Sequence, residues 1–336
     1  MARILPATPE AVQQAAAALR SGQLVAFPTE TVYGLGAAAL DPQAVARIYE
    51  LKGRPKAHPL IVHLPPGQPL GEWAEDPPEL ALGLARRFWP GPLTLVLRRG
   101  ARVPDAVTGG QNTVALRTPD HPVALALLEA FGGGVAAPSA NRFGHISPTR
   151  AEHVAAEFGG DLLILDGGPS QVGLESTILD LSQVNDNGLV RLLRPGGVPL
   201  AAIEAHLGFS VQLPALAGAG EEGLTGEGGA PPRAPGGLAS HYAPQAPTRL
   251  VTGAELARLA SSDQTADLAV LALGAPPQGF RGHWRALPED PVEYGRQLYA
   301  ALRELDAAAP KQILIEVVPT GEAWLAVRDR LKRAAT

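Results

Sequence analysis

The sequence predicts an α/β protein built from two units that are joined by an irregular linker. Short runs rich in β-formers alternate with helical patterns, which is typical of mixed α/β folds. With 336 residues, the chain exceeds one average domain and is long enough for two cores. A stretch dense in glycine and proline, residues 216–238, interrupts the alternation. We therefore expect a first unit over residues 1–210, a linker over 211–245 and a second unit over 246–336.

The first unit is predicted to contain many strands, because apolar and β-branched residues cluster in short runs between turn residues. The expected strands are Gln23–Phe27, Leu60–Leu64, Leu93–Arg99, Thr113–Arg117, Val135–Ala137, Leu162–Asp166, Thr177–Leu181 and Leu189–Arg194. Helices are expected over Pro42–Leu51, Pro78–Phe88 and His121–Phe131. The first helix starts with a proline directly after Asp41, a favourable N-cap residue.

The linker and the second unit differ sharply in pattern. Residues 216–238 have almost no apolar periodicity, so they cannot bury enough surface to form a packed element. Beyond them, strands are expected over Thr248–Val251, Ala269–Leu273 and Ile313–Val317, and helices over Ala254–Ala260, Val292–Asp306 and Ala323–Lys332. This alternation predicts a small parallel sheet with helices on its faces.

Composition narrows the possible functions. The formal net charge of −5 argues against a protein that coats nucleic acid by bulk electrostatics. The absence of cysteine excludes disulfides, thiolate catalysis and cysteine-ligated zinc. No signal-peptide core and no run of about eighteen apolar residues occurs, so we expect a cytoplasmic protein without a membrane partner. The usual P-loop and G-x-G-x-x-G motifs are also missing, so phosphates would have to be bound by side chains and local backbone amides.

Polar residues follow the first predicted strand, in the segment Pro28–Gly36 (PTETVYGLG). Hydroxyls and a carboxylate at a strand end suit a small polar ligand, although a plain turn with capping residues explains them equally well. A second cluster, KGRPK over Lys52–Lys56, could supply several donors to a polyphosphate. The alternative is that these cations only complement a helix C-terminus. His63, isolated in an apolar strand, could face a pocket or be a hydrogen-bonded core histidine.

Two further clusters lie at strand ends. Arg117 ends an apolar strand, and burying it is costly unless a ligand carboxylate or a structural acidic residue pairs with it. The segment Ala137–Asn141 (APSAN) offers small residues, a hydroxyl and an amide, which allow close approach to a phosphate. Ser147 and Thr149 follow, and they could instead cap a helix near residue 150.

Together these motifs are much more specific than any one of them. The set PTETVYGLG, KGRP, PLIVH, VALRTP, APSAN, SPT, EST and LLRPG, in this order over residues 8–208, resembles the YrdC family of threonylcarbamoyl-AMP synthases. The later Ser240–Pro244 (SHYAP) resembles the long, two-domain form of that family. The resemblance implies a twisted mixed-sheet domain around a large, positively lined cavity, with a smaller Rossmann-like C-terminal domain.

The resemblance also implies an activity. Members of the family join bicarbonate or CO₂ to the amino group of L-threonine and transfer AMP from ATP, with release of pyrophosphate. Their product feeds the N6-threonylcarbamoyl modification of adenosine 37 in tRNAs that read ANN codons, so a tRNA-modifying threonylcarbamoyl transferase is the expected downstream partner. Mg²⁺ is expected to accompany ATP, and no dedicated metal site is evident in the sequence.

Site residues follow from the matching motif positions. The family's K-x-R plus S-x-N tetrad corresponds to Lys52, Arg54, Ser139 and Asn141, the expected catalytic residues. ATP is expected to contact Arg54, His58, Thr113, Ser139, Ser147, Arg194 and Tyr242, and threonine to contact Thr31, His63, Arg117, Ala137 and Ser176. Tyr242 would close over the nucleotide as a lid, and catalysis would rest on positioning and electrostatics.

One position departs from the family, and two rival functions stay open. The family often has asparagine where this chain has His58, and a neutral imidazole makes fewer of the amide's hydrogen bonds. The first rival is a carbamoyl-adenylate-handling module without threonine-specific activity. The second is a module that binds tRNA or other RNA weakly in the cavity, which a steep salt dependence would reveal. A sensor that binds ATP and threonine without turnover is a further possibility.

Overall fold

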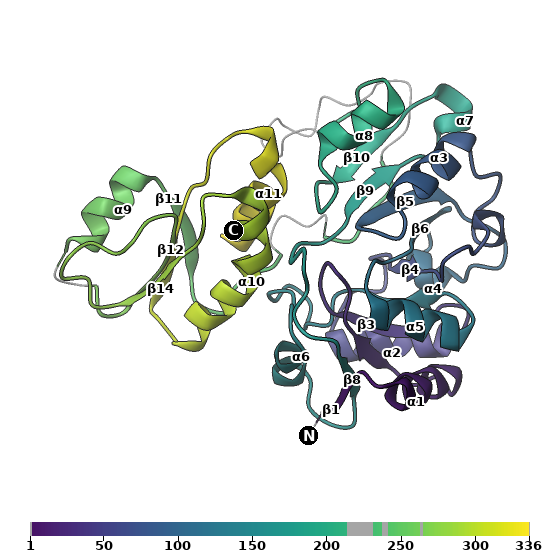
Figure 1. Ribbon diagram of the computed structural model, residues 1–336, viewed down its shortest axis with the longest axis horizontal. Helices are drawn as coiled ribbons and strands as arrows, with labels where there is room; N and C mark the ends of the chain where they lie inside the picture. The colour runs from purple at the N-terminus through teal and green to yellow at the C-terminus, as the bar shows by residue number, and fades with distance from the viewer. Residues whose placement is uncertain (1, 214–230, 237–240, 263–264, 336) are drawn as a thin grey trace.

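The computed structural model describes residues 2–213, 231–236, 241–262 and 265–335, and its strands form two separate sheets. Most of the expected linker, residues 214–230 and 237–240, lies outside the described residues. Figure 1 shows the large sheet with its helices on one side of the molecule and the small sheet on the other. The predicted α/β class, with a large mixed sheet and a small parallel sheet, is confirmed.

The large sheet has ten strands of mixed direction. In spatial order they are β1 (Arg3–Pro6), β8 (Leu163–Asp166), β2 (Val25–Phe27), β3 (Gly34–Ala38), β7 (Val135–Ala136), β4 (Ile61–His63), β6 (Thr113–Arg117), β5 (Leu93–Arg98), β9 (Thr177–Asp180) and β10 (Arg191–Arg194). The register pairs His63 with Arg117 on the neighbouring parallel strands β4 and β6. Two residues from separate motifs are thereby brought side by side.

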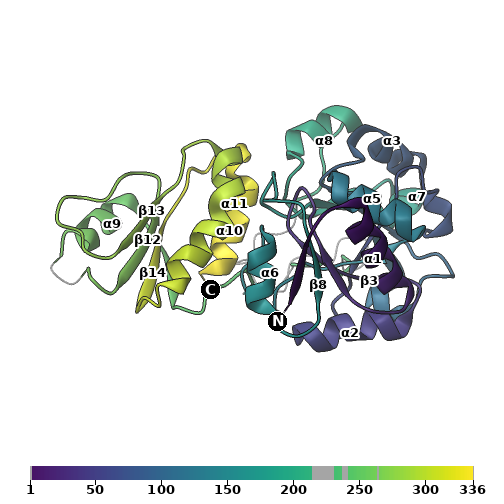
Figure 2. The ribbon, with the colours of Figure 1, turned by 60° about the horizontal axis from the view of Figure 1, so that its bottom comes forward.

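Helices cover both faces of this sheet. On one face α1 (Pro9–Arg20) and α5 (Pro122–Phe131) pack against β2, β7 and β8 in one apolar cluster. The other face is covered by α2 (Pro42–Lys52), α3 (Glu79–Phe88), α4 (Asp105–Thr108), α6 (Ala151–Glu157) and α8 (Leu200–Leu207). The view in Figure 2 brings α1 and α2 forward. The short η1 (Leu70–Glu72) and α7 (Val184–Asn187) complete the described elements of this unit.

The small sheet is parallel throughout its described pairs. Its order is β11 (Thr248–Val251), β14 (Gln312–Glu316), β12 (Leu268–Ala272) and β13 (His283–Ala286). One face carries α9 (Gly253–Ala260), and the other carries α10 (Pro291–Ala307) and α11 (Leu325–Ala334), which follows η2 (Glu322–Trp324). In Figures 1 and 2, α10 and α11 lie between the small sheet and the first unit.

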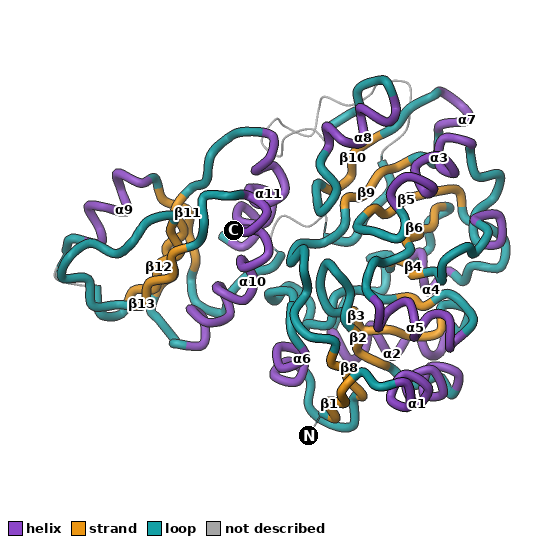
Figure 3. The backbone as a smooth tube through the Cα atoms, viewed as in Figure 1, coloured by secondary structure: helices purple, strands orange, loops and turns teal. Residues whose placement is uncertain are grey.

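The two units share one apolar cluster. Val32, Ile146 and Leu174 of the first unit are buried together with residues of α10 and α11. Close approach requires glycine at Gly173, where φ is +73° and an added Cβ would lie 2.5 Å from the Cα of Arg296. Figure 3 shows that the segments of the first unit facing these helices are mostly loops. The C-terminal helices therefore contact the loops that follow the central strands.

Several elements differ from expectation. The segment PTETVYGLG is expected to be turn-rich throughout, but its last residues begin strand β3. This strand is easily missed because Gly34 and Gly36 carry no side-chain pattern; at Gly36 a Cβ would lie 2.8 Å from Cγ1 of Val135. No element is expected before residue 23, yet β1 and α1 form there, and α1 begins with a Thr8 cap and a proline. Strand β13 is largely exposed and has no apolar alternation.

Candidate functional site

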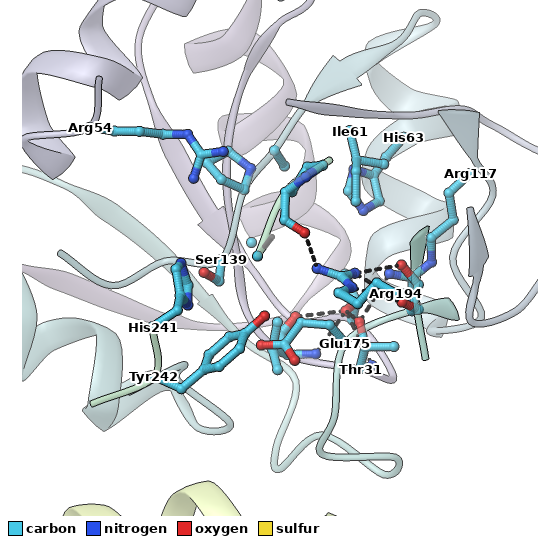
Figure 4. A pocket seen from close by; sticks show the side chains of 18 residues that line it. Thr31, Arg54, Ile61, His63, Arg117, Ser139, Glu175, Arg194, His241 and Tyr242 are labelled. Carbon is cyan, nitrogen blue, oxygen red and sulfur yellow. Dashed lines mark hydrogen bonds between the residues drawn. The ribbon is translucent and has the colours of Figure 1, made fainter. Parts of the chain in front are cut away.

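A buried cavity lies where the central strands of the large sheet end, and both halves of the predicted site contribute to it (Figure 4). Its lining residues are Thr29, Thr31, Val32, Gly34, Arg54, Ile61, His63, Arg117, Ala137, Pro138, Ser139, Glu175, Ser176, Arg194, Pro235, Gly236, His241 and Tyr242. Three arginines and one carboxylate face this space. The lining is therefore positively charged overall and suited to anionic ligands.

Arg117 is held by three partners but keeps donors free. Its Nε donates to the carbonyl oxygen of Gly91 at 3.1 Å, its Nη1 to Oγ1 of Thr31 at 3.0 Å, and its Nη2 lies 2.5 Å from Oε1 of Glu30. The structural acidic partner considered from the sequence is thus present. A guanidinium has five N–H groups, so two remain after these contacts. Arg117 can therefore take a ligand carboxylate while Glu30 fixes its orientation.

His63 is a neutral, buried imidazole next to this arginine. Burial lowers its pKa to about 3, and the charge of Arg117 acts in the same direction. Its Nδ1 is buried and has no hydrogen-bond partner among the described residues. The ring meets Phe27 edge-on, with 6.0 Å between the centroids. One ring nitrogen is consequently available to a ligand without bringing in a second positive charge.

The tetrad residues divide into two kinds. Arg54 and Ser139 line the cavity, whereas Lys52 and Asn141 are buried behind it. The ammonium of Lys52 donates to the carbonyl oxygens of Ser139, at 2.6 Å, and of Asn141. Nδ2 of Asn141 donates to the carbonyl oxygens of residues 142 and 145, at 2.7 Å and 2.9 Å. In this arrangement Lys52 and Asn141 hold the loop that carries Ser139.

Arg54 reaches the cavity from the end of α2, where Gly53 adopts the left-handed conformation that ends the helix. Its Nη2 donates to the carbonyl oxygen of Pro59 at 2.9 Å, and its guanidinium lies 5.7 Å from the ring centroid of Phe143. Burial lowers the pKa of Arg54 to about 10, which still leaves it protonated at neutral pH. Capping a helix end does not account for a cation buried this deeply, because a capping cation can stay in water.

Arg194 and Ser176 form the third side of the cavity. Nε and Nη2 of Arg194 donate to the carbonyl oxygen of Ser176 at 3.1 Å and 2.9 Å, and Nη2 also donates to its hydroxyl at 3.1 Å. The same hydroxyl lies 2.7 Å from Oγ1 of Thr94. Nη1 of Arg194 donates to the carbonyl oxygen of Pro235 at 3.0 Å. Arg194 therefore connects the strand ends to the described part of the linker.

Of the expected ligand residues, His58, Thr113 and Ser147 do not line the cavity. His58 is half-buried and lies against Phe143, with 5.4 Å between the ring centroids. Thr113 starts β6 and pairs with Arg98. The hydroxyl of Ser147 donates to Oε1 of Glu175 at 2.7 Å.

His241 and Tyr242 of the SHYAP segment line the cavity. Tyr242 is 1% exposed and has a positive φ of 64°, and its ring centroid lies 5.2 Å from Cζ of Arg330. An added Cβ on Gly236 would come within 2.3 Å of its hydroxyl oxygen, so the two linker segments are in close contact. The remaining free volume is about 50 Å³, whereas pockets for small-molecule ligands span roughly 300–1,000 Å³. Four described linker residues, Pro235, Gly236, His241 and Tyr242, thus border the space where the resemblance implies a large cavity.

Sequence reasoning missed three residues that the structure places at this site. Glu175 was quoted in the EST motif but given no role, and it lines the cavity. Tyr299 on α10 and Arg330 on α11 both donate to it and are fully buried. Nothing in the pattern of the two C-terminal helices distinguishes these side chains from ordinary interface residues.

Neither a metal site nor a membrane segment is found in the described part of the chain. Among those residues, no group of three His, Asp or Glu side chains could hold a metal ion. The one carboxylate lining the cavity, Glu175, is already engaged by arginine, tyrosine and serine. No described helix combines the length and the apolar character needed to span a bilayer.

Comparison with known proteins identifies the family of this chain. The family model for Sua5, YciO and YrdC proteins, described as telomere recombination, matches residues 17–196, and the threonylcarbamoyl-AMP synthase C-terminal domain matches residues 198–336. A threonylcarbamoyl-AMP synthase from Pyrococcus abyssi is 42% identical, covering 96% of this chain and 94% of that protein. One from Bacillus subtilis is 41% identical, covering 96% and 92%.

A solved structure extends the similarity to three dimensions. Sua5 from P. abyssi, complexed with L-threonine, matches with a TM-score of 0.86 and 39% identity, covering 100% of this chain and 97% of that one. Fold and relatives thus define an α/β enzyme, and its cavity is lined by three arginines. The chain belongs to the Sua5/YrdC family of threonylcarbamoyl-AMP synthases, in its two-domain form.

Proposed function

We propose that this enzyme makes L-threonylcarbamoyl-AMP from L-threonine, bicarbonate or CO₂, and ATP, with release of pyrophosphate. The observation that carries the proposal is one cavity with two kinds of anion site. Arg117, with two free N–H groups beside Thr31 and His63, suits an amino-acid carboxylate, and Arg54 and Arg194 suit phosphates. The full-length relatives named threonylcarbamoyl-AMP synthase support the same reaction.

The threonine subsite would position the first nucleophile. With the substrate carboxylate on Arg117, the amino group can be oriented by Thr31 and by the neutral His63, which accepts a hydrogen bond without repelling the substrate. The unprotonated amine nitrogen attacks the carbon of CO₂ and gives up a proton to water, forming an N-carboxylate. Ala137 and Ser176 complete this subsite, where their small size leaves room for the substrate.

The ATP subsite would carry the second step. A carbamate oxygen attacks the α-phosphorus of ATP, the bond to the bridging oxygen breaks, and pyrophosphate leaves with that electron pair. Arg54 and Arg194, both buried, would stabilise the charge that develops on the leaving group, since such interactions are strong where water is excluded. Mg²⁺ bound to the nucleotide would neutralise further phosphate charge. We assign no covalent nucleophile.

The remaining tetrad residues and the linker would act by organising this subsite. Lys52 and Asn141 hold the loop bearing Ser139 from behind, so their contribution is orientation of the phosphate-facing hydroxyl. Ser147, His58 and Thr113 would contact ATP only after a local rearrangement, because none of them lines the cavity. Tyr242 would then close over the bound nucleotide and exclude water from the hydrolysis-prone mixed anhydride.

The product would be consumed by a threonylcarbamoyl transferase that modifies adenosine in tRNA, because a carbamoyl adenylate is an activated acyl donor. To test the proposal, the purified chain is incubated with ATP, threonine, bicarbonate and Mg²⁺, and the products are analysed by mass spectrometry. We expect threonylcarbamoyl-AMP and an equal amount of pyrophosphate, both dependent on threonine. Pyrophosphate release that ignores threonine would contradict the assignment, and binding of both ligands without any product would leave a sensor instead.

A further inference from the structure

A buried carboxylate joins the cavity to the C-terminal helices. Glu175 is 6% exposed and precedes strand β9. Its carboxylate accepts hydrogen bonds from Oγ of Ser147 at 2.7 Å, from the hydroxyl of Tyr299 at 2.9 Å and from Nε of Arg330 at 2.6 Å. Two of these three donors come from α10 and α11, while Glu175 and Ser147 belong to the first unit. Glu175 therefore forms hydrogen bonds between the two units at the edge of the cavity.

Arg330 contacts three segments, each carrying a residue that lines the cavity. Its Nε binds Glu175, next to Ser176, and its Nη2 donates to the carbonyl oxygen of Pro195 at 3.0 Å, next to Arg194. Its guanidinium also lies under the ring of Tyr242. Arg330 therefore holds both the segment of Glu175 and the segment of Pro195. The residues next to these, Ser176 and Arg194, are hydrogen-bonded to each other.

Charged and hydroxyl neighbours favour the ionised form of Glu175. Burial on its own would raise the pKa of Glu175, but the charges of Arg330 and Arg194 and the hydrogen bonds from Arg330 and Ser147 bring it to about 2. The group is therefore a carboxylate at neutral pH and accepts from all its donors. A carboxylate already occupied in this way is poorly suited to bind a metal or move a proton. Its remaining role is to hold other groups in place.

We propose that Tyr299 and Arg330 are positioning residues of the catalytic site, acting through Glu175 on Ser147, Ser176 and Arg194. The proposal rests on the function proposed above. It gives the C-terminal unit a part in catalysis: α10 and α11 set the geometry of residues in and around the cavity from outside the first unit. Neither residue lines the cavity, so each would act through the contacts described.

The test uses a matched pair of substitutions on one helix. Tyr299→Phe removes the hydroxyl that binds Glu175 and keeps the buried ring. Tyr294→Phe is the control, because Tyr294 is equally buried on α10 but its hydroxyl has no hydrogen-bond partner among the described residues. Removing one hydrogen bond to a buried charge should cost about tenfold in kcat/KM for ATP. Tyr294→Phe should stay within about twofold of the unaltered chain.

A purely structural role would lower the melting temperature without changing ligand affinity at a temperature where all variants are folded. We therefore measure melting by calorimetry, ATP binding by titration calorimetry and the kinetic constants on the same samples. Glu175→Gln is the second variant, since it keeps the shape but removes the charge that Arg330 and Tyr299 share. It should weaken ATP binding at least as much as Tyr299→Phe.

Coupling to Ser147 gives an independent readout. If Tyr299 acts through Glu175 on Ser147, Tyr299→Phe should matter less when Ser147 is already alanine, so the double variant loses less than the product of the single losses. Equal kinetics of Tyr299→Phe and the unaltered chain, equal losses in both tyrosine variants, or strictly multiplicative losses would each overturn the proposal. If the unaltered chain makes no threonylcarbamoyl-AMP, the proposed function fails separately, and ATP binding of the variants still decides this inference.

Discussion

Acidification should destabilise the fold through His63, and the size of the effect follows from its burial. His63 is 4% exposed, and burial lowers its pKa from 6.5 to about 3. The unfolded chain therefore binds one more proton than the native protein between these values. The stabilisation from keeping His63 neutral is fully present above pH 6.5 and is lost as the pH falls toward 3.

The magnitude between pH 7 and pH 5 can be worked out directly. For each extra proton bound by the unfolded chain, the free energy of unfolding falls by about 1.4 kcal/mol per pH unit. Because pH 5 lies about 1.5 units below the pKa of His63 in the unfolded chain, this residue alone should lower the free energy of unfolding by about 2 kcal/mol. Glu175 does not contribute in this range, because its stabilisation is lost only between about pH 4.5 and 2. Burial likewise lowers the pKa of His241 to about 3 and of His153 to about 4, so both add to the total for the unaltered chain.

The assay is urea unfolding at pH 7 and at pH 5 for the unaltered chain, His63→Gln and a control. His63→Gln will be less stable at pH 7, but its free energy of unfolding should fall by about 2 kcal/mol less on acidification. The control is His283→Gln on the exposed strand β13, where the side chain is in water in both states. Identical pH dependence of His63→Gln and the unaltered chain would refute the reasoning.

Three further predictions concern the cavity. Arg54→Ala should lower kcat/KM for ATP by about a hundredfold, because a buried phosphate loses its charged partner; threonine-dependent pyrophosphate release within a few-fold of normal would contradict this. Arg117→Lys should raise KM for threonine about tenfold with little change in KM for ATP. The reason is that an ammonium cannot replace the guanidinium fork that also binds Thr31 and Glu30. Steady-state kinetics with each substrate varied would show an equal rise in both KM values if the assignment is wrong. Gly236→Ala should weaken packing of this linker residue against Tyr242 by about 1–2 kcal/mol, because its φ is +77° and its Cβ would clash with the Tyr242 hydroxyl. Stopped-flow release of a fluorescent ATP analogue should then be faster. An unchanged release rate would argue against Tyr242 acting as a lid.

Much of the central architecture could be predicted because it depends on local pattern. Strands β4, β6 and β9 and helices α2 and α10 form close to the expected bounds, since apolar alternation and capping residues such as Asp41 and Asp290 act within a few residues of chain. The motif positions also lead to the cavity: nine of the expected residues line it, namely Thr31, Arg54, His63, Arg117, Ala137, Ser139, Ser176, Arg194 and Tyr242. Strand β3 was missed where glycines remove the pattern.

The sequence by itself determined the fold class, the family and the identity of the cations and hydroxyls that surround the cavity, because each of these depends on neighbouring residues or on motifs in a fixed order. Only the tertiary structure decided where those side chains point. It turned Lys52 toward the carbonyl oxygens of Ser139 and Asn141, and it joined Glu175 to Tyr299 and Arg330, 124 and 155 positions further along the chain. Such contacts leave no periodic trace, because their partners are set by how the two units pack and not by any local preference of the backbone.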